Sequence, residues 1–101
     1  MLTETLPPHD AEAEAAVLGS LLIDPDAMLD VGDLLTADAF YRPAYRWTYE
    51  AIAALHARQE PLDLLAVRAE LAKAGRLQEV GDLPALAELL NSVPTSISAE
   101  Y

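Results

Sequence analysis

The feature that most constrains this chain is a cluster of aromatic residues within an otherwise aliphatic sequence. Aromatic side chains bury the largest area per residue, so a core with few of them is expected to form where they gather. Five of the six aromatic residues fall within ten positions: Phe40, Tyr41, Tyr45, Trp47 and Tyr49. We therefore expect the hydrophobic core to be organised around this segment.

The aromatic segment is predicted to be a central helix over residues 43–55. Pro43 suits the first turn of a helix, where its missing N–H group would have no partner. Side chains spaced three and four apart then form one face: Tyr45, Thr48, Tyr49, Ile52 and Leu55. The opposite face, with Arg46 and Glu50, is expected to be solvated or lightly packed. Trp47 lies beside the main stripe, so we expect it either at the edge of the core, which we favour, or exposed as a partner contact.

The remaining composition favours helix almost everywhere. The chain contains 19 Ala and 18 Leu against only 8 Val and Ile. Ala and Leu are strong helix formers, whereas β-branched residues are typical of strands. At 101 residues the chain has the length of one domain. We predict an all-α fold, a compact bundle of about five helices.

Two helices are predicted before the aromatic segment. Asp10 is a good N-cap for the first helix. The side chains of this helix that are expected to face inward are Ala15, Leu18, Leu21 and Leu22, with Val17 alongside. Gly19, inside this helix, is either a tolerated small residue or, as we prefer, a point where another helix approaches closely. Asp24 and Pro25 are predicted to start a second helix that runs to about Leu34. That helix is expected to bury Met28, Leu29, Val31 or Leu34, and Leu35.

Two more helices are predicted after it. Residues 58–62 form a loop, and Asp63 caps a helix that stops at Gly75 in a left-handed conformation. The stripe of this helix is Leu64, Val67, Leu71 and Ala74. Residues 76–82 are expected to be a connector, and residues 83–90 a short helix. That helix is predicted to bury Leu83, Leu86, Ala87 and Leu90.

The predicted domain boundaries follow from the two ends of this helical region. Residues 1–9 contain consecutive prolines and are expected to be an extended leader. The helical globular head then spans residues 10–94, because a proline breaks its last helix. Thr95 or Ser96 is a good N-cap with barely a turn of chain after it. We therefore expect residues 95–101 to be the start of a truncated helix, in a fragment of a longer protein.

The charge distribution argues against nucleic-acid binding by this chain. Its net charge is −11, and the first 41 residues carry nine acids and no Lys or Arg. Binding to nucleic acid relies on Lys and Arg to neutralise phosphates. The acidity is explained either by solubility, which we favour, or by a specific basic partner.

A search for catalytic, cofactor-binding or metal-binding residues yields none. No Glu is followed by His three positions later, and His9 and His56 lie far apart, so neither a di-metal site nor an acid–base dyad is indicated. The isolated glycines do not form a phosphate-binding loop. Four aspartates lack the spacing of an EF-hand and are interpreted as a cap and a solvated face: Asp24, Asp26, Asp30 and Asp33.

The sequence carries no signal for a membrane or an oxidising compartment. No apolar run approaches the ~20 residues that span a bilayer, and the N-terminal region lacks the basic-then-apolar pattern of a signal peptide. The absence of cysteine excludes disulfides and thiolate metal sites. A cytoplasmic protein fits these features best.

Several short motifs are spread in order over nearly the whole chain: Pro8-His9, Glu12-Ala13-Glu14, Val17-Leu18-Gly19-Ser20-Leu21-Leu22, Phe40-Tyr41, Tyr49 with Ala51-Ile52, Pro61-Leu62-Asp63, Gly75 with Leu77, Val80-Gly81 and Pro94-Thr95. Together and in this order they resemble the opening of bacterial replicative DNA helicases of the DnaB type. Two positions depart from the family pattern, because Asp82 stands where a second glycine is usual and Tyr45 where a histidine is common.

This resemblance implies a helical head that is followed, in such helicases, by a helical hairpin and a RecA-like ATPase domain. The ATPase domain holds ATP, magnesium and single-stranded DNA. The hairpins pair the subunits into a collar on the hexamer, and the collar also receives the primase. The resemblance thus implies a non-catalytic assembly and primase-docking domain, with ATP and magnesium belonging to the absent C-terminal domain. Without the hairpin, the fragment is expected to be a monomer.

The residues alone also allow a different class of function. A free-standing acidic helical adaptor that binds a basic protein or peptide would have the same charge and the same helical pattern. A small helical enzyme that uses carboxylates is disfavoured, because neither paired acid–base groups nor a phosphate loop is present.

The charge argument predicts that this chain does not bind single-stranded DNA at physiological salt. With a net charge of −11, approach to a polyanion is repulsive. Fluorescence anisotropy with a labelled oligonucleotide measures this directly. A submicromolar affinity that weakens steeply as salt is added would contradict the prediction.

Overall fold

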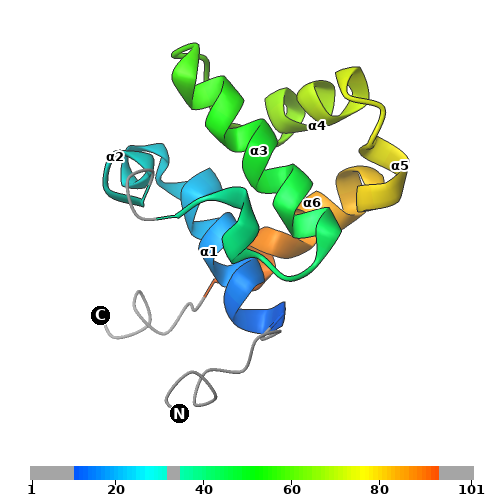
Figure 1. Cartoon of the computed structure of the whole chain (residues 1–101), viewed down its shortest axis with the longest axis horizontal. Helices are drawn as coiled ribbons and strands as arrows, with labels where there is room; N and C mark the ends of the chain where they lie inside the picture. Colours follow the sequence, from blue (N-terminus) through cyan, green and yellow to red (C-terminus); the bar gives the residue numbers. More distant parts are fainter. Residues whose placement is uncertain (1–10, 32–34, 94–101) are drawn as a thin grey trace.

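The computed structural model describes residues 11–31 and 35–93. These residues form helices joined by short loops (Figure 1), and no strand occurs in either described range, so the predicted all-helical fold is confirmed. Within these ranges no helix is both long and apolar enough to cross a membrane. In chain order the elements are α1 (Ala11–Ile23), the 3₁₀ turn η2 (Pro25–Ala27), α2 (Met28–Val31), the 3₁₀ turn η3 (Ala37–Ala39), α3 (Pro43–Ala57), α4 (Leu64–Lys73), α5 (Leu77–Val80) and α6 (Asp82–Asn91).

Helix α3 is the central helix, as predicted. Pro43 occupies the first turn of α3. The helix crosses the molecule between α1 and α4 and packs against both (Figure 1). Its inward face matches the predicted stripe, with Tyr45 half-buried and four residues buried: Thr48, Tyr49, Ile52 and Leu55. The Tyr49 hydroxyl donates a hydrogen bond to the Leu35 carbonyl at 3.0 Å, and its ring centroid lies 5.3 Å from that of Phe40. The aromatic cluster therefore fixes the chain that leads into α3.

The buried side chains form one cluster to which every long helix contributes. The predicted stripe of α1 is buried in full, and Trp47 is partly buried against the cluster, which confirms its expected place at the core edge. The cluster consists of Ala15, Leu18, Leu21, Leu22, Met28, Phe40, Tyr49, Ala51, Ile52, Leu55, Leu62, Val67, Leu71, Leu86 and Leu89.

Helices α1 and α6 meet at Gly19. A Cβ atom added there would collide with the carbonyl oxygen of Leu89 and would lie 2.7 Å from Cγ2 of Val93. Such approaches are too close for any side chain. The prediction that another helix approaches closely at Gly19 is confirmed, and that helix is α6.

The predicted second helix from Asp24 to about Leu34 begins differently from the prediction. The chain first forms the 3₁₀ turn η2, and α-helical geometry begins only at Met28, the first residue of α2. Residues 32–34 lie outside the described residues, so the predicted end near Leu34 stays a prediction. Met28 is buried as expected, and Leu35 is half-buried. Leu29 was expected to be buried, but it is 66% exposed, because its neighbour Met28 takes the inward position of α2.

Helix α4 begins and ends where the sequence predicts. The Asp63 carboxylate accepts a hydrogen bond from the Ala66 N–H group at 2.8 Å, which caps the helix, and Gly75 has a φ of 74°. The inward residues are Leu64, Val67 and Leu71. Ala74 was predicted to share this face, but it is exposed because the helix ends at Lys73 and Ala74 is already its C-cap.

The connector predicted over residues 76–82 contains a turn of helix, α5, and the first residue of α6. Gly81 and Asp82 both have positive φ, of 110° and 60°. Asp is one of the few residues that tolerate this region, because its short side chain can form local hydrogen bonds. Here the Asp82 carboxylate accepts a hydrogen bond from the Leu83 N–H group at 2.6 Å. Two successive left-handed residues therefore separate α5 from α6.

The inward face of α6 is rotated relative to the prediction. Leu86 is buried as expected, but Leu89, which was not predicted, is buried beside it. The other predicted positions are only half-buried: Leu83, Ala87 and Leu90. A repeat of leucines at three- and four-residue spacings fits more than one face. The contact of Leu89 with Gly19 selects the face that is used.

Several predictions lie outside the described residues. They are the leader over residues 1–9 with His9, the N-cap at Asp10, the burial of Leu34, the break at Pro94 and the helix start at residues 95–101. The side chain of Val31 is not described either.

Gly19→Leu is expected to destabilise the fold by about 1–3 kcal/mol, because the added atoms meet the backbone of α6. Gly19→Ala is expected to destabilise it less, since alanine gains ~1 kcal/mol in helix propensity against the same backbone contact. The free energy of unfolding in urea is the measurement. Ala13→Leu, at an exposed position of the same helix, is the matched control. Equal stability of Gly19→Leu and the parent would contradict the close approach.

Candidate partner-docking surface

One acidic side chain on each of α3, α4 and α6 is bound by a cation of the chain: Glu50, Glu70 and Asp82. Glu50 accepts from Arg76 at 2.7 Å, and Asp82 accepts from Arg68 at 2.8 Å. In the part of the chain that the structure describes, no group of three or more His, Asp or Glu side chains is placed to hold a metal ion. His56 lies half-buried in the last turn of α3. These carboxylates are therefore arranged as structural ion pairs.

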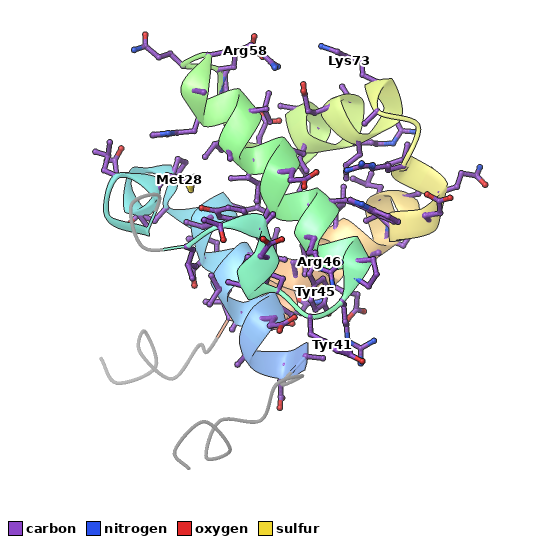
Figure 2. All side chains as sticks on the ribbon, viewed as in Figure 1. Met28, Tyr41, Tyr45, Arg46, Arg58 and Lys73 are labelled. Atoms are coloured by element: carbon purple, nitrogen blue, oxygen red, sulfur yellow. The ribbon has the colours of Figure 1, made fainter. Side chains whose placement is uncertain are left out.

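Arg58 joins the end of α3 to α4. Its Nη2 donates to Oε1 of Glu70 at 2.7 Å, and its Nε donates to Oε2 of Glu60 at 3.1 Å. Lys73 Nζ lies 3.8 Å from the same Glu70 oxygen, and Figure 2 shows Arg58 and Lys73 at the same end of the molecule. The hydrogen bonds from Arg58 hold the pKa values of Glu60 and Glu70 below their ordinary value. The turn between the two helices is thus fixed by a small charge network.

Arg76 joins α5 to α3. Besides its bond to Glu50, the Arg76 guanidinium lies 5.1 Å from the centroid of the Trp47 ring, within the range of a cation–π contact. Together with Ala51 and Leu71, these residues line a small hollow of about 190 Å³. This arrangement accounts for the partial burial of Trp47 and holds the single turn of α5 in place.

Arg46 was expected on a solvated or lightly packed face, but it has a positioning role. Its Nε donates to the Phe40 carbonyl and its Nη2 to the Tyr41 carbonyl, both at 2.8 Å. The Tyr41 N–H group donates to a carboxylate oxygen of Glu14 at 3.0 Å. Figure 2 shows Arg46, Tyr45 and Tyr41 close together where the chain enters α3. Arginine spaced six residues from a carbonyl gives no sequence signal, so sequence reasoning missed this contact.

One open groove lies between η2–α2 and the loop that joins α3 to α4. Its volume is about 410 Å³, and we call it the Leu29 groove. Leu62, which is 4% exposed, also lines it. Its other lining residues are Pro25, Asp26 and Leu29 from one wall and His56, Gln59, Glu60, Pro61 and Asp63 from the other. The groove is therefore apolar inside and acidic at its rim.

A second open groove adjoins the first at Asp63. It measures about 480 Å³, and we call it the Leu65 groove. It lies where α1, α4 and α6 come together, and its other lining residues are Leu22, Leu64, Leu65 and Leu90. Leu65 is 67% exposed, close to the exposure of Leu29. Exposed apolar surface rimmed by polar residues is typical of a protein contact site.

Comparison with known proteins identifies the family of this chain. Residues 6–101 match the family described as DnaB-like helicase N terminal domain. The chain belongs to this family. A crystal structure of the N-terminal domain of DnaB helicase from Mycobacterium tuberculosis superposes with a TM-score of 0.83 at 44% identity, over 95% of this chain and 67% of that one. The predicted family resemblance is confirmed.

Two curated relatives set the scale of the match. The replicative DNA helicase DnaC of Bacillus subtilis is 42% identical over all 101 residues, which is 22% of its own length. The replicative DNA helicase DnaB of Mycobacterium leprae is 44% identical over 95 residues, or 94% of this chain and 16% of that protein. This DnaB-like domain therefore spans about a fifth of the length of the relatives it matches.

Acid is expected to destabilise this domain through the Arg58 network. The folded-state pKa values of Glu60 and Glu70 are lowered, so the stability that the network adds is present above the unfolded pKa. It is lost as the pH falls through the folded pKa values, which lie below the ordinary glutamate value of about 4.3. The midpoint of urea unfolding, followed from neutral pH into this acidic range, measures the effect.

Glu70→Gln is expected to flatten that dependence on pH, because the paired carboxylate is gone. Glu79→Gln is the matched control, since Glu79 makes no ion pair within the described ranges. An unchanged slope in Glu70→Gln would show that the network contributes nothing to acid sensitivity.

Proposed function

We propose that this chain is the N-terminal assembly and partner-docking domain of a hexameric replicative DNA helicase, which unwinds DNA at the replication fork with ATP. The match of residues 6–101 to the DnaB-like helicase N terminal domain is the observation that carries the proposal. The relatives that share this region are named replicative DNA helicases. Because the match covers about a fifth of their length, unwinding itself is assigned to the rest of such a protein.

The proposed division of the chain has three parts. Residues 1–9 are a leader, residues 10–94 are the globular head, and residues 95–101 begin a helix of the hairpin. The proposal is supported by the single buried cluster that joins α1 to α6, which gives the head its own core.

The proposed role of this domain is non-catalytic. ATP and magnesium are assigned to the C-terminal domain of the parent protein. The carboxylates of Glu50, Glu60, Glu70 and Asp82 are all bound by arginine, which supports a structural use for them. The sequence also has no glycine-rich phosphate loop.

The proposed partners are other helicase subunits and the primase, in the cytoplasm. Protein contacts are favoured because both grooves present an exposed leucine, and the Leu29 groove is also lined by three acids. Such a surface repels phosphates, which argues against direct binding of nucleic acid. Collar formation and primase docking are thus assigned to protein–protein recognition.

The alternative is a free-standing acidic adaptor for a basic protein or peptide, and the acid-rimmed Leu29 groove is the observation that favours it. The two functions differ in what the gene is expected to encode after this region. A reading frame that continues beyond residue 101 into an ATPase domain with a phosphate loop is expected for the helicase and excluded for the adaptor.

This chain is expected to be a monomer in solution, whereas a chain extended through the hairpin is expected to dimerise or to form the hexamer. The apolar stripes of the head are used in its own core, and a net charge of −11 repels an identical copy. Sedimentation equilibrium on the two chains is the test. A stable dimer of the 101-residue chain would place a self-association surface on the head, and assembly through the hairpin alone would be wrong.

A further inference from the structure

We propose that the Leu29 groove binds an amphipathic helical segment of a partner protein, in which leucine-like side chains are flanked by lysine or arginine. The inference rests on the proposed docking function and names the surface and the chemistry of the segment that it receives.

The apolar part of the site is Leu29 and its surroundings. Leu29 is 66% exposed, although its neighbour Met28 is buried at 4% exposure and anchors α2 to the core (Figure 2). Because Met28 is fixed, Leu29 is presented on a held backbone and loses little freedom on binding. Pro25 and Pro61 are rigid residues of the same groove. A volume of about 410 Å³ leaves room for apolar side chains of a docked segment.

The charged part of the site is its rim. Asp26, Glu60 and Asp63 line the groove together with His56, and Arg58 in the adjoining loop is bound to Glu60 and Glu70. Arg42 lies at the N-cap of α3, and the remaining three arginines are engaged elsewhere: Arg46, Arg68 and Arg76. The rim therefore keeps a negative potential that complements lysine or arginine beside an apolar anchor.

A second copy of this chain does not fit the groove. In a symmetric pair the same surface would face itself, so the acidic rims of the two copies would be brought together. The net charge of −11 adds to that repulsion. A basic partner gains from the same charges, which is why the proposal commits to one.

The test uses the 101-residue chain and a labelled synthetic peptide of leucine and lysine, with leucine at helical spacing along one face. Fluorescence anisotropy gives the affinity, and a peptide with glutamate in place of lysine is the charge control. We expect saturable binding of the lysine peptide and none of the glutamate peptide. Equal binding of the two peptides, or no binding of the lysine peptide, would overturn the proposal.

Matched variants locate the site. Leu29→Ser is expected to weaken binding about tenfold, since the burial of one leucine is lost. Leu65→Ser is the control, because Leu65 is equally exposed but lines the other groove. Both positions are exposed, so neither change disturbs the core. A loss in Leu65→Ser as large as that in Leu29→Ser would overturn the assignment to this groove.

The charge of the rim is tested in the same way. Asp26→Asn is expected to weaken binding about threefold, with a smaller effect at high salt. Glu79→Gln removes one charge from α5, which lies on the opposite side of the molecule from α2 (Figure 1), and is expected to change affinity little. Equal effects of the two variants would show attraction to the net charge alone and would overturn the assigned rim.

The outcomes also separate this inference from the proposed function. If the lysine peptide fails to bind while the chain extended through the hairpin assembles, the groove assignment is wrong and the assembly function stands. If the peptide binds with the expected variant pattern but the extended chain does not assemble, the assembly function is wrong and the groove remains a docking site.

Discussion

The contact between α1 and α6 at Gly19 is the constraint on which the rest of the fold depends. Only a residue without a side chain lets the backbone of Leu89 lie against α1, and this brings the first and last long helices of the described region together. The same contact turns Leu86 and Leu89 inward, where they join the buried residues of α1, α3 and α4. The close approach of the α1 and α6 backbones at Gly19 therefore sets the distance between these two helices, and the buried leucines fill the space between them.

Charge has two separate uses on this scaffold. Three arginines bind carboxylates of other elements and fix geometry that the core does not reach. Arg58 acts at the α3–α4 turn, Arg68 of α4 binds the first residue of α6, and Arg76 acts at the start of α5. Each pair is exposed, so it orients the chain more than it stabilises the fold. The acids at the rim of the Leu29 groove exceed the cations beside them and set the potential that a partner meets.

The sequence predicted the elements whose signals are local. Pro43 marks the start of α3, and Asp63 and Gly75 mark the two ends of α4, so these boundaries are predicted correctly. The apolar residues of α1 and of α3 fit only one face of each helix, so the buried face is predicted correctly too. The start of the second helix was predicted wrongly, because Asp24 and Pro25 mark the beginning of a helical segment but do not distinguish a 3₁₀ turn from an α-helix. The positive φ of Asp82 was not predicted from its residue type, although the family resemblance marked that position as one where glycine is usual. The family itself was predicted from motif order, whereas the grooves were not, because they depend on which leucines the packing leaves outside.

The acidity of the domain and its exposed leucines are best understood together. Leu29 and Leu65 each leave two thirds of their surface in water, and both lie beside open grooves, an arrangement that promotes self-association in a neutral protein. A net charge of −11 opposes that association between identical copies and attracts a basic partner. The same charge therefore allows the apolar surface to remain uncovered in the free chain and restricts which segments can cover it. On this view solubility and a specific basic partner, the two explanations that the sequence left open, are consequences of one charge distribution.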